Sequence, residues 1–130
     1  MKIYDSSQNL LAIVIKKGTS KEEKDFHTDD SSEFQLGTFN LQKDTVIERH
    51  YHQKQERKIH STNEVLVLQE GKMLITIYDL NLNKVEDITL ESGDMVALFD
   101  GGHEIKVEED SNFIEVKQGP YIEGQDKTRF

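Results

Sequence analysis

A chain of 130 residues fits one domain that can bury a hydrophobic core without disulfides. It has no cysteine, which excludes disulfides, thiolate metal sites and cysteine nucleophiles. Its 25 acidic residues outnumber the 16 basic ones, so the average surface repels a phosphate backbone and nucleic acid is not an expected partner.

The amino-terminal sequence lacks the features of a targeting or membrane segment. Residues 1–5 do not form a charged segment leading into a long apolar run. The first apolar run, Leu10–Ile15, is too short to span a bilayer. We therefore expect a cytoplasmic protein with no membrane partner.

The first third of the chain alternates between apolar and polar segments. Leu10–Ile15 is a continuous apolar run closed by a turn, which predicts a strand. Residues 19–32 are nearly all polar and predict a long exposed loop, in which His27 is expected to be solvated. Alternation over residues 34–39 predicts another strand, and residues 42–44 predict a turn.

Short β-rich runs recur in the second half of the chain between glycine and polar turns. The predicted strands are residues 65–68, 72–78, 85–90, 95–99, 103–108 and 112–117, with a turn predicted at Glu70 and Gly71. No segment has a convincing helical period. This spacing of strands favours an all-β sandwich or barrel.

Two histidines form the clearest chemical motif. His50 and His52, one residue apart on a predicted strand, project from the same face, which suits metal binding. Glu64 opens the next apolar run, and His103 follows a later one. Imidazole nitrogens and one carboxylate fit Zn²⁺, Mn²⁺, Fe²⁺ or Ni²⁺, and the sequence does not choose among these ions.

The order of these motifs resembles the cupin superfamily. Its first motif has a His-x-His, a glutamate and, after six further residues, a glycine, matched in type by His50, His52, Glu64 and Gly71. Its second motif begins with glycine and ends in histidine. In this chain Gly93 stands at the beginning, and Gly101 and His103 stand at the end. The resemblance implies a double-stranded β-helix, or jelly roll, with His50, His52, Glu64 and His103 as metal ligands. The expected domain has its barrel core over about 34–118, the polar loop at 19–32 and a tail at 119–130.

The chain departs from the first cupin motif in the spacing between the His-x-His and the glutamate. Eleven residues, 53–63, separate His52 from Glu64, which is longer than the motif usually allows and implies an inserted loop. Glu56 has the usual gap and is the alternative ligand. Glu64 is preferred because it alone precedes an apolar strand and a correctly spaced glycine.

Several functions fit this resemblance, because the cupin fold hosts many reactions. The leading hypothesis is a metal-dependent enzyme, such as an isomerase, epimerase or oxygenase, acting on a small polar metabolite in carbohydrate metabolism, for example a sugar or sugar-nucleotide derivative. The alternative is a non-catalytic binding or sensing cupin. The third hypothesis is a metal-free sugar-nucleotide isomerase with His50 and either Glu115 or Tyr78 as the proton-transfer pair.

Two further expectations concern the ligand and the assembly. The sequence assigns no catalytic residue, and His60, Tyr78 and Glu115 are the candidates for contact with substrate. Cupins commonly pair through their sheets, so the resemblance implies a homodimer. The apolar run Leu10–Ile15 could supply its edge strand.

Overall fold

The computed structural model describes residues 1–124 and 126–130, and every regular element in them is a β-strand. The strands are β1 (Lys2–Tyr4), β2 (Leu10–Ile15), β3 (Lys24–Phe26), β4 (Gly37–Phe39), β5 (Glu64–Tyr78), β6 (Lys84–Glu91), β7 (Met95–Leu98) and β8 (Gly102–Lys117). The predicted all-β class is confirmed.

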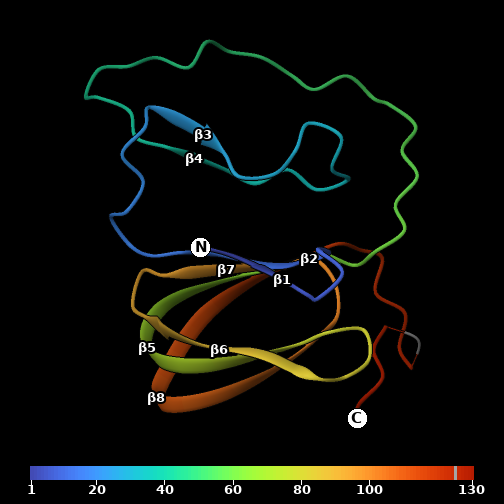
Figure 1. The fold of residues 1–130 in the computed structure, drawn as a ribbon. Helices are drawn as coiled ribbons and strands as arrows, with labels where there is room; N and C mark the ends of the chain where they lie inside the picture. The colour runs from blue at the N-terminus through green and yellow to red at the C-terminus, as the bar shows by residue number, and fades with distance from the viewer. Residues whose placement is uncertain (125) are drawn as a thin grey trace.

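Six strands form one strongly curled antiparallel sheet, a half-barrel (Figure 1). The strand order is β1-β2-β7-β5-β6, and β8 pairs with β5. The hairpin of β3 and β4 is a separate two-stranded sheet that lies over the half-barrel (Figure 1). None of the residues that the structure describes forms a helix long and apolar enough to cross a membrane.

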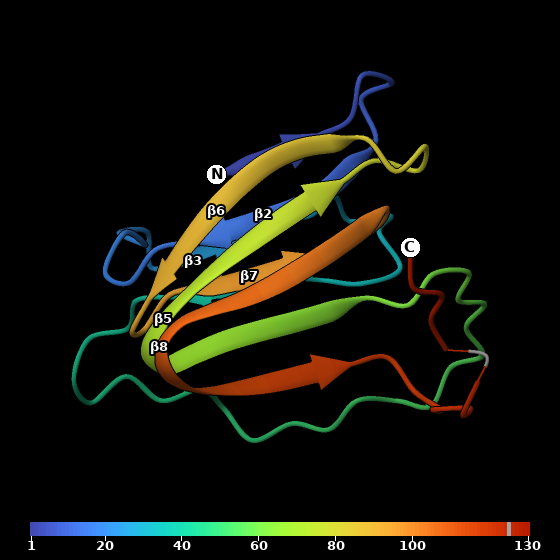
Figure 2. The same cartoon turned by 90° about the horizontal axis from the view of Figure 1, so that it is seen from below.

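The curl comes from β5 and β8, which both bend back on themselves (Figure 2). The first half of β5 pairs with β7 and its second half with β6, while β8 follows β5 through both halves. The pairing shifts register between Leu68 and Met73, around Gly71 with φ +91°. A β-carbon on Gly71 would lie 2.2 Å from the carbonyl oxygen of Asp110, so only glycine fits this bend.

The main core fills the inside of the curl. Strand alternation points one set of β5 side chains inward, and these are almost completely buried: Leu66, Leu68, Met73, Ile75 and Ile77. A second cluster lies on the other face of the sheet, where Ile13, Val65 and Ala97 pack against Leu36 and Phe34. This second cluster holds the segment before β4 on the half-barrel.

Most predicted strands are confirmed, and the errors in where they begin and end have local causes. The run Leu10–Ile15 is β2, and residues 85–90 and 95–99 correspond to β6 and β7. The turn predicted at Gly71 is wrong, because β5 continues through it as a bend. Likewise, residues 103–108 and 112–117 belong to one strand, β8.

One prediction in the first half of the chain is wrong, and two others are confirmed only in part. The polar loop 19–32 contains β3, and only the last three residues of 34–39 form a strand, β4. Residues 45–52, which include the predicted histidine strand Glu48–His52, are exposed and irregular. Their two aliphatic residues, Val46 and Ile47, are adjacent and so cannot share one buried strand face.

Candidate functional site

Glu64 and His103 meet at the end of the half-barrel where β5 begins. Glu64 is the first residue of β5 and shares the inward face of Leu66 and Leu68. His103 pairs with Ile77 near the other end of β5, and the bend of β5 brings that end back over its beginning. The Nε2 atom of His103 lies 3.3 Å from Oε2 of Glu64. The two side chains are 32% and 16% exposed, respectively.

Lys117 completes a group of three at this place. It pairs directly with Glu64 across β5 and β8, so both side chains lie on the same face of the sheet. Its Nζ atom is 3.8 Å from Oε1 of Glu64 and donates a 2.7 Å hydrogen bond to Oδ2 of Asp126 in the tail. The hydrogen bond to Asp126 raises the pKa of Lys117 despite the opposing effect of desolvation. We call Glu64, His103 and Lys117 the mouth site.

The carboxyl-terminal tail borders the mouth site. The ring of Phe130 packs edge to face against Tyr78, with centroids 5.2 Å apart. It also lies over Gly102, where a β-carbon would come within 2.8 Å of the Phe130 ring. The Tyr78 hydroxyl donates to Glu104 at 3.3 Å, and desolvation together with the charge of Glu104 raises the pKa of Tyr78. These contacts fix Tyr78 beside the start of β8.

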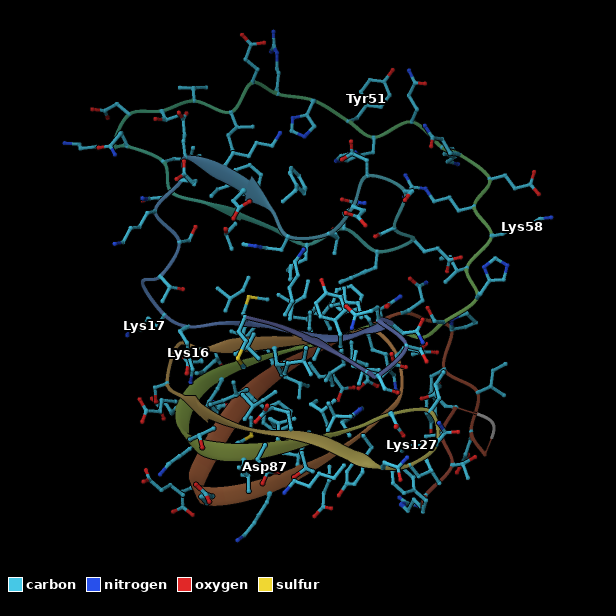
Figure 3. The ribbon with its side chains drawn as sticks, in the orientation of Figure 1. Lys16, Lys17, Tyr51, Lys58, Asp87 and Lys127 are labelled. Carbon is cyan, nitrogen blue, oxygen red and sulfur yellow. The ribbon has the colours of Figure 1, made fainter. Side chains whose placement is uncertain are left out.

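His50 and His52 lie elsewhere, on the exposed irregular segment that arches over β3 and β4. Their ring centroids are 5.4 Å apart, and Nδ1 of His50 donates to the carbonyl oxygen of Glu48 at 2.8 Å. Tyr51, between them, points outward (Figure 3). The four predicted metal ligands therefore form two separate pairs, His50 with His52 on the loop and Glu64 with His103 in the mouth site.

The described residues contain no group of three or more histidines and carboxylates arranged to hold a metal ion. As they lie, the four predicted ligands do not fit one ion, because the pair on the loop and the pair in the mouth site are separate. The metal site stays a prediction.

The remaining candidates occupy different surroundings. His60 is held by Glu33, whose carboxylate contacts Nδ1 of the ring and accepts the His60 amide at 2.8 Å. These hydrogen bonds lower the pKa of Glu33. Glu56, the alternative ligand, is exposed on the same loop. Glu115 pairs with Leu66, so it lies on the same face of the sheet as Leu66, but its side chain is exposed.

Sequence reasoning considered Lys117 only through the strand face that it shares with Glu115, as a candidate if that face pointed inward, and it did not consider Asp126. The signal for Lys117 was its place two residues after Glu115 on the last strand, which puts both on one face. Its approach to Glu64 depends on the β5–β8 register, which no local pattern specifies. Asp126 is in the tail, and no sequence pattern marks it as a site residue.

Comparisons of the chain with protein-family models, with curated proteins and with solved structures found no match.

Proposed function

We propose that the chain binds a small polar metabolite at the mouth site and catalyses proton transfer on it, with His103 as the acid–base group. The observation that carries this proposal is the 3.3 Å approach of His103 to Glu64 beside the ammonium group of Lys117. A carboxylate next to an imidazole orients the ring, and imidazole is a common acid–base group in proton transfer.

Each of the three side chains has a separate role in an isomerase or epimerase reaction. His103 removes a proton from a carbon next to a carbonyl group, Glu64 stabilises the imidazolium that forms, and Lys117 stabilises the negative charge that develops on the carbonyl oxygen. Return of the proton to a different atom, or to the other face, completes the reaction. No oxidant or reductant is needed. A sugar or sugar-nucleotide derivative with a carbonyl group is the proposed substrate class.

The cupin resemblance supports this proposal at two positions. Glu64 and His103 are the residues that match the glutamate of the first motif and the histidine of the second, and they are in contact across a curled antiparallel sheet. A jelly-roll barrel is the finer fold that we propose for the half-barrel.

Deuterium exchange into a panel of sugars tests the proposal. The protein is incubated in heavy water with free and nucleotide-linked sugars, and mass spectrometry measures the deuterium incorporated into each. We expect one sugar class to gain deuterium, and His103→Gln to slow this gain by about 100-fold or more. Glu64→Gln should slow it too, while the matched exposed-strand variant Glu109→Gln should not.

Binding without exchange would contradict the catalytic proposal. A sugar that raises the unfolding temperature but gains no deuterium would instead identify a non-catalytic binding or sensing protein.

A metal-dependent site is the second candidate. It is carried by the cupin resemblance at His50, His52, Glu64 and His103, of which Glu64 and His103 are in contact. Elemental analysis of protein prepared with zinc, manganese, iron and nickel tests it. A bound ion should be lost in Glu64→Gln and retained in Glu56→Gln, because an amide is a much poorer ligand than a carboxylate. Metal retained after the His52→Ala substitution would remove the loop histidines from the site.

A further inference from the structure

A second cluster of reactive side chains lies on the hairpin of β3 and β4. Oγ of Ser20 donates a 2.8 Å hydrogen bond to Oγ1 of Thr38. The Thr38 hydroxyl lies 3.0 Å from Nε2 of His27, and Nδ1 of His27 lies 3.4 Å from Oδ2 of Asp25. Hydroxyl, imidazole and carboxylate groups are thus connected in one chain, which we call the hairpin relay.

The relay follows from the geometry of the hairpin. Asp25 pairs directly with Thr38, so both side chains lie on the same face. His27, two residues after Asp25, lies on that face as well, and its amide extends the pairing by donating to the carbonyl oxygen of Leu36 at 2.8 Å. The sequence predicted a solvated histidine here. The structure instead leaves the His27 side chain only 21% exposed, with the Thr38 hydroxyl 3.0 Å from Nε2 and the Asp25 carboxylate 3.4 Å from Nδ1.

The relay opens onto a cavity between the hairpin and the half-barrel. The cavity has a volume of about 410 Å³, and its lining includes Ser20, Asp25 and His27. Ile13 and Ile15 of β2 form an apolar part of the wall, and Lys2 and Lys21 add positive charge. This volume is within the range of small-molecule sites, and an apolar wall with a few converging polar groups is their usual composition.

The donor directions suit activation of a hydroxyl. Oδ2 of Asp25 lies 3.4 Å from Nδ1 of His27, and a proton on Nδ1 leaves Nε2 as the acceptor for the Thr38 hydroxyl. The Thr38 oxygen in turn accepts from Ser20. A proton can therefore move from Ser20 through Thr38 to His27. Ser20 lines the cavity and carries the terminal hydroxyl of the relay, which makes its oxygen the candidate nucleophile.

We propose that the hairpin relay is a serine-type acyl-transfer site for small esters, separate from the mouth site. Oγ of Ser20 forms a bond to the ester carbonyl carbon while its proton passes through Thr38 to His27. The tetrahedral intermediate expels the alcohol, which takes the proton from His27, and water hydrolyses the acyl–Ser20 ester by the same route. Lys2 and Lys21, which line the cavity, favour the oxyanion of the intermediate.

Covalent labelling with an alkyl fluorophosphonate tests this proposal on the intact protein. Attack by Ser20 forms an oxygen–phosphorus bond and expels fluoride. We expect mass spectrometry to place the label on Ser20. His27→Gln and Thr38→Val should each slow labelling by about 100-fold, because the serine then loses its route to a base. Exposed Ser6, in the turn after β1, provides the control, and Ser6→Ala should label at the wild-type rate.

Three outcomes would overturn the proposal: no labelling of Ser20, labelling of Thr38 in its place, or equal labelling rates in wild type and His27→Gln. Circular dichroism and thermal unfolding of each variant show whether it remains folded. If Thr38→Val does not fold, Thr38→Ser is the replacement, and it should keep the relay and the labelling rate. Hydrolysis of p-nitrophenyl acetate measures turnover. His27→Gln should slow this hydrolysis, and Glu109→Gln, at an exposed position of β8, should leave it unchanged.

Discussion

Asp94 is the buried carboxylate on which several backbone segments converge. It accepts hydrogen bonds from Nζ of Lys16 at 2.7 Å, from the Lys17 amide at 2.8 Å and from the Glu91 amide at 2.9 Å. Burial opposes ionisation of Asp94, but the hydrogen bonds from Lys16, Glu91 and Lys17 outweigh it and lower its pKa. The carboxylate thus joins the end of β2 to the turn between β6 and β7.

Removal of this carboxylate should destabilise the fold. Asp94→Ala leaves the Lys17 and Glu91 amides without their acceptor, at a cost of about 1–3 kcal/mol in the free energy of unfolding. Urea denaturation measures it. Asp87→Ala is the control, since Asp87 forms an exposed pair with Lys84, and it should have little effect. Equal losses in the two variants would show that Asp94 has no special role.

The same residue gives the stability a defined pH dependence. Because the folded pKa of Asp94 is below its unfolded value of about 3.9, the stabilisation is complete above that pH. It is lost as the pH falls through the lower, folded pKa. In Asp94→Asn the acid-induced loss should be smaller than in wild type, and an unchanged acid transition would contradict this assignment.

At the residue scale, sequence patterns found part of the mouth site. Glu64 and His103 were recognisable because each has a fixed place relative to an apolar strand and a glycine. Lys117 joins them through long-range pairing, and Asp126 through the path of the tail. No local pattern encodes either contact. His27 was misread because its partner Thr38 comes from the opposite strand of the hairpin.

The bend in β5 is the element that creates the mouth site. A glycine between two β-rich runs, as at Gly71, is compatible with a tight turn between two strands and also with a bend within one strand. Which of the two forms depends on β8, which follows β5 through the bend and packs Asp110 against Gly71. The sequence therefore predicted a break at the right residue but not its kind.

Substitution of Gly71 should destabilise the bend that joins the two halves of β5. Gly71→Ala adds left-handed backbone strain and a clash with Asp110, and should cost about 3 kcal/mol or more in the free energy of unfolding. Gly18→Ala is the matched control, because Gly18 has φ +72° and open space around its α-carbon. Gly18→Ala should lower the free energy of unfolding only by the cost of a left-handed backbone conformation, about 1–2 kcal/mol. Equal losses would show that contact with β8 does not determine the bend.

The predicted homodimer needs a different edge from the one that the sequence suggested. The run Leu10–Ile15 is β2, which is buried between β1 and β7 and so is not an edge strand. Within the residues that the structure describes, β8 pairs with β5 alone and exposes Ile114 and Val116 on one face. Long, exposed, partly apolar edges are suited to pairing with another chain. We propose that two copies associate through β8.

Sedimentation equilibrium tests this association. The chain mass is 15.0 kDa, so a dimer should sediment at twice that value. Ile114→Lys should weaken the dimer by about tenfold or more, since a charge would replace an apolar contact at the interface. Leu80→Lys, at another exposed apolar position, should leave it unchanged. A monomer at micromolar concentration would remove the proposal.

At the scale of the whole molecule, the half-barrel gathers residues from both ends of β5 and β8 at one mouth, and the proposed function depends on a ligand binding there. The most direct measurement is a map of NMR chemical-shift changes on addition of the sugar that gains deuterium. We expect the largest changes at Glu64, His103 and Lys117, and we expect Lys117→Gln to weaken binding while Lys106→Gln does not. Changes centred on the His50–His52 segment, with none at the mouth site, would contradict the proposed function.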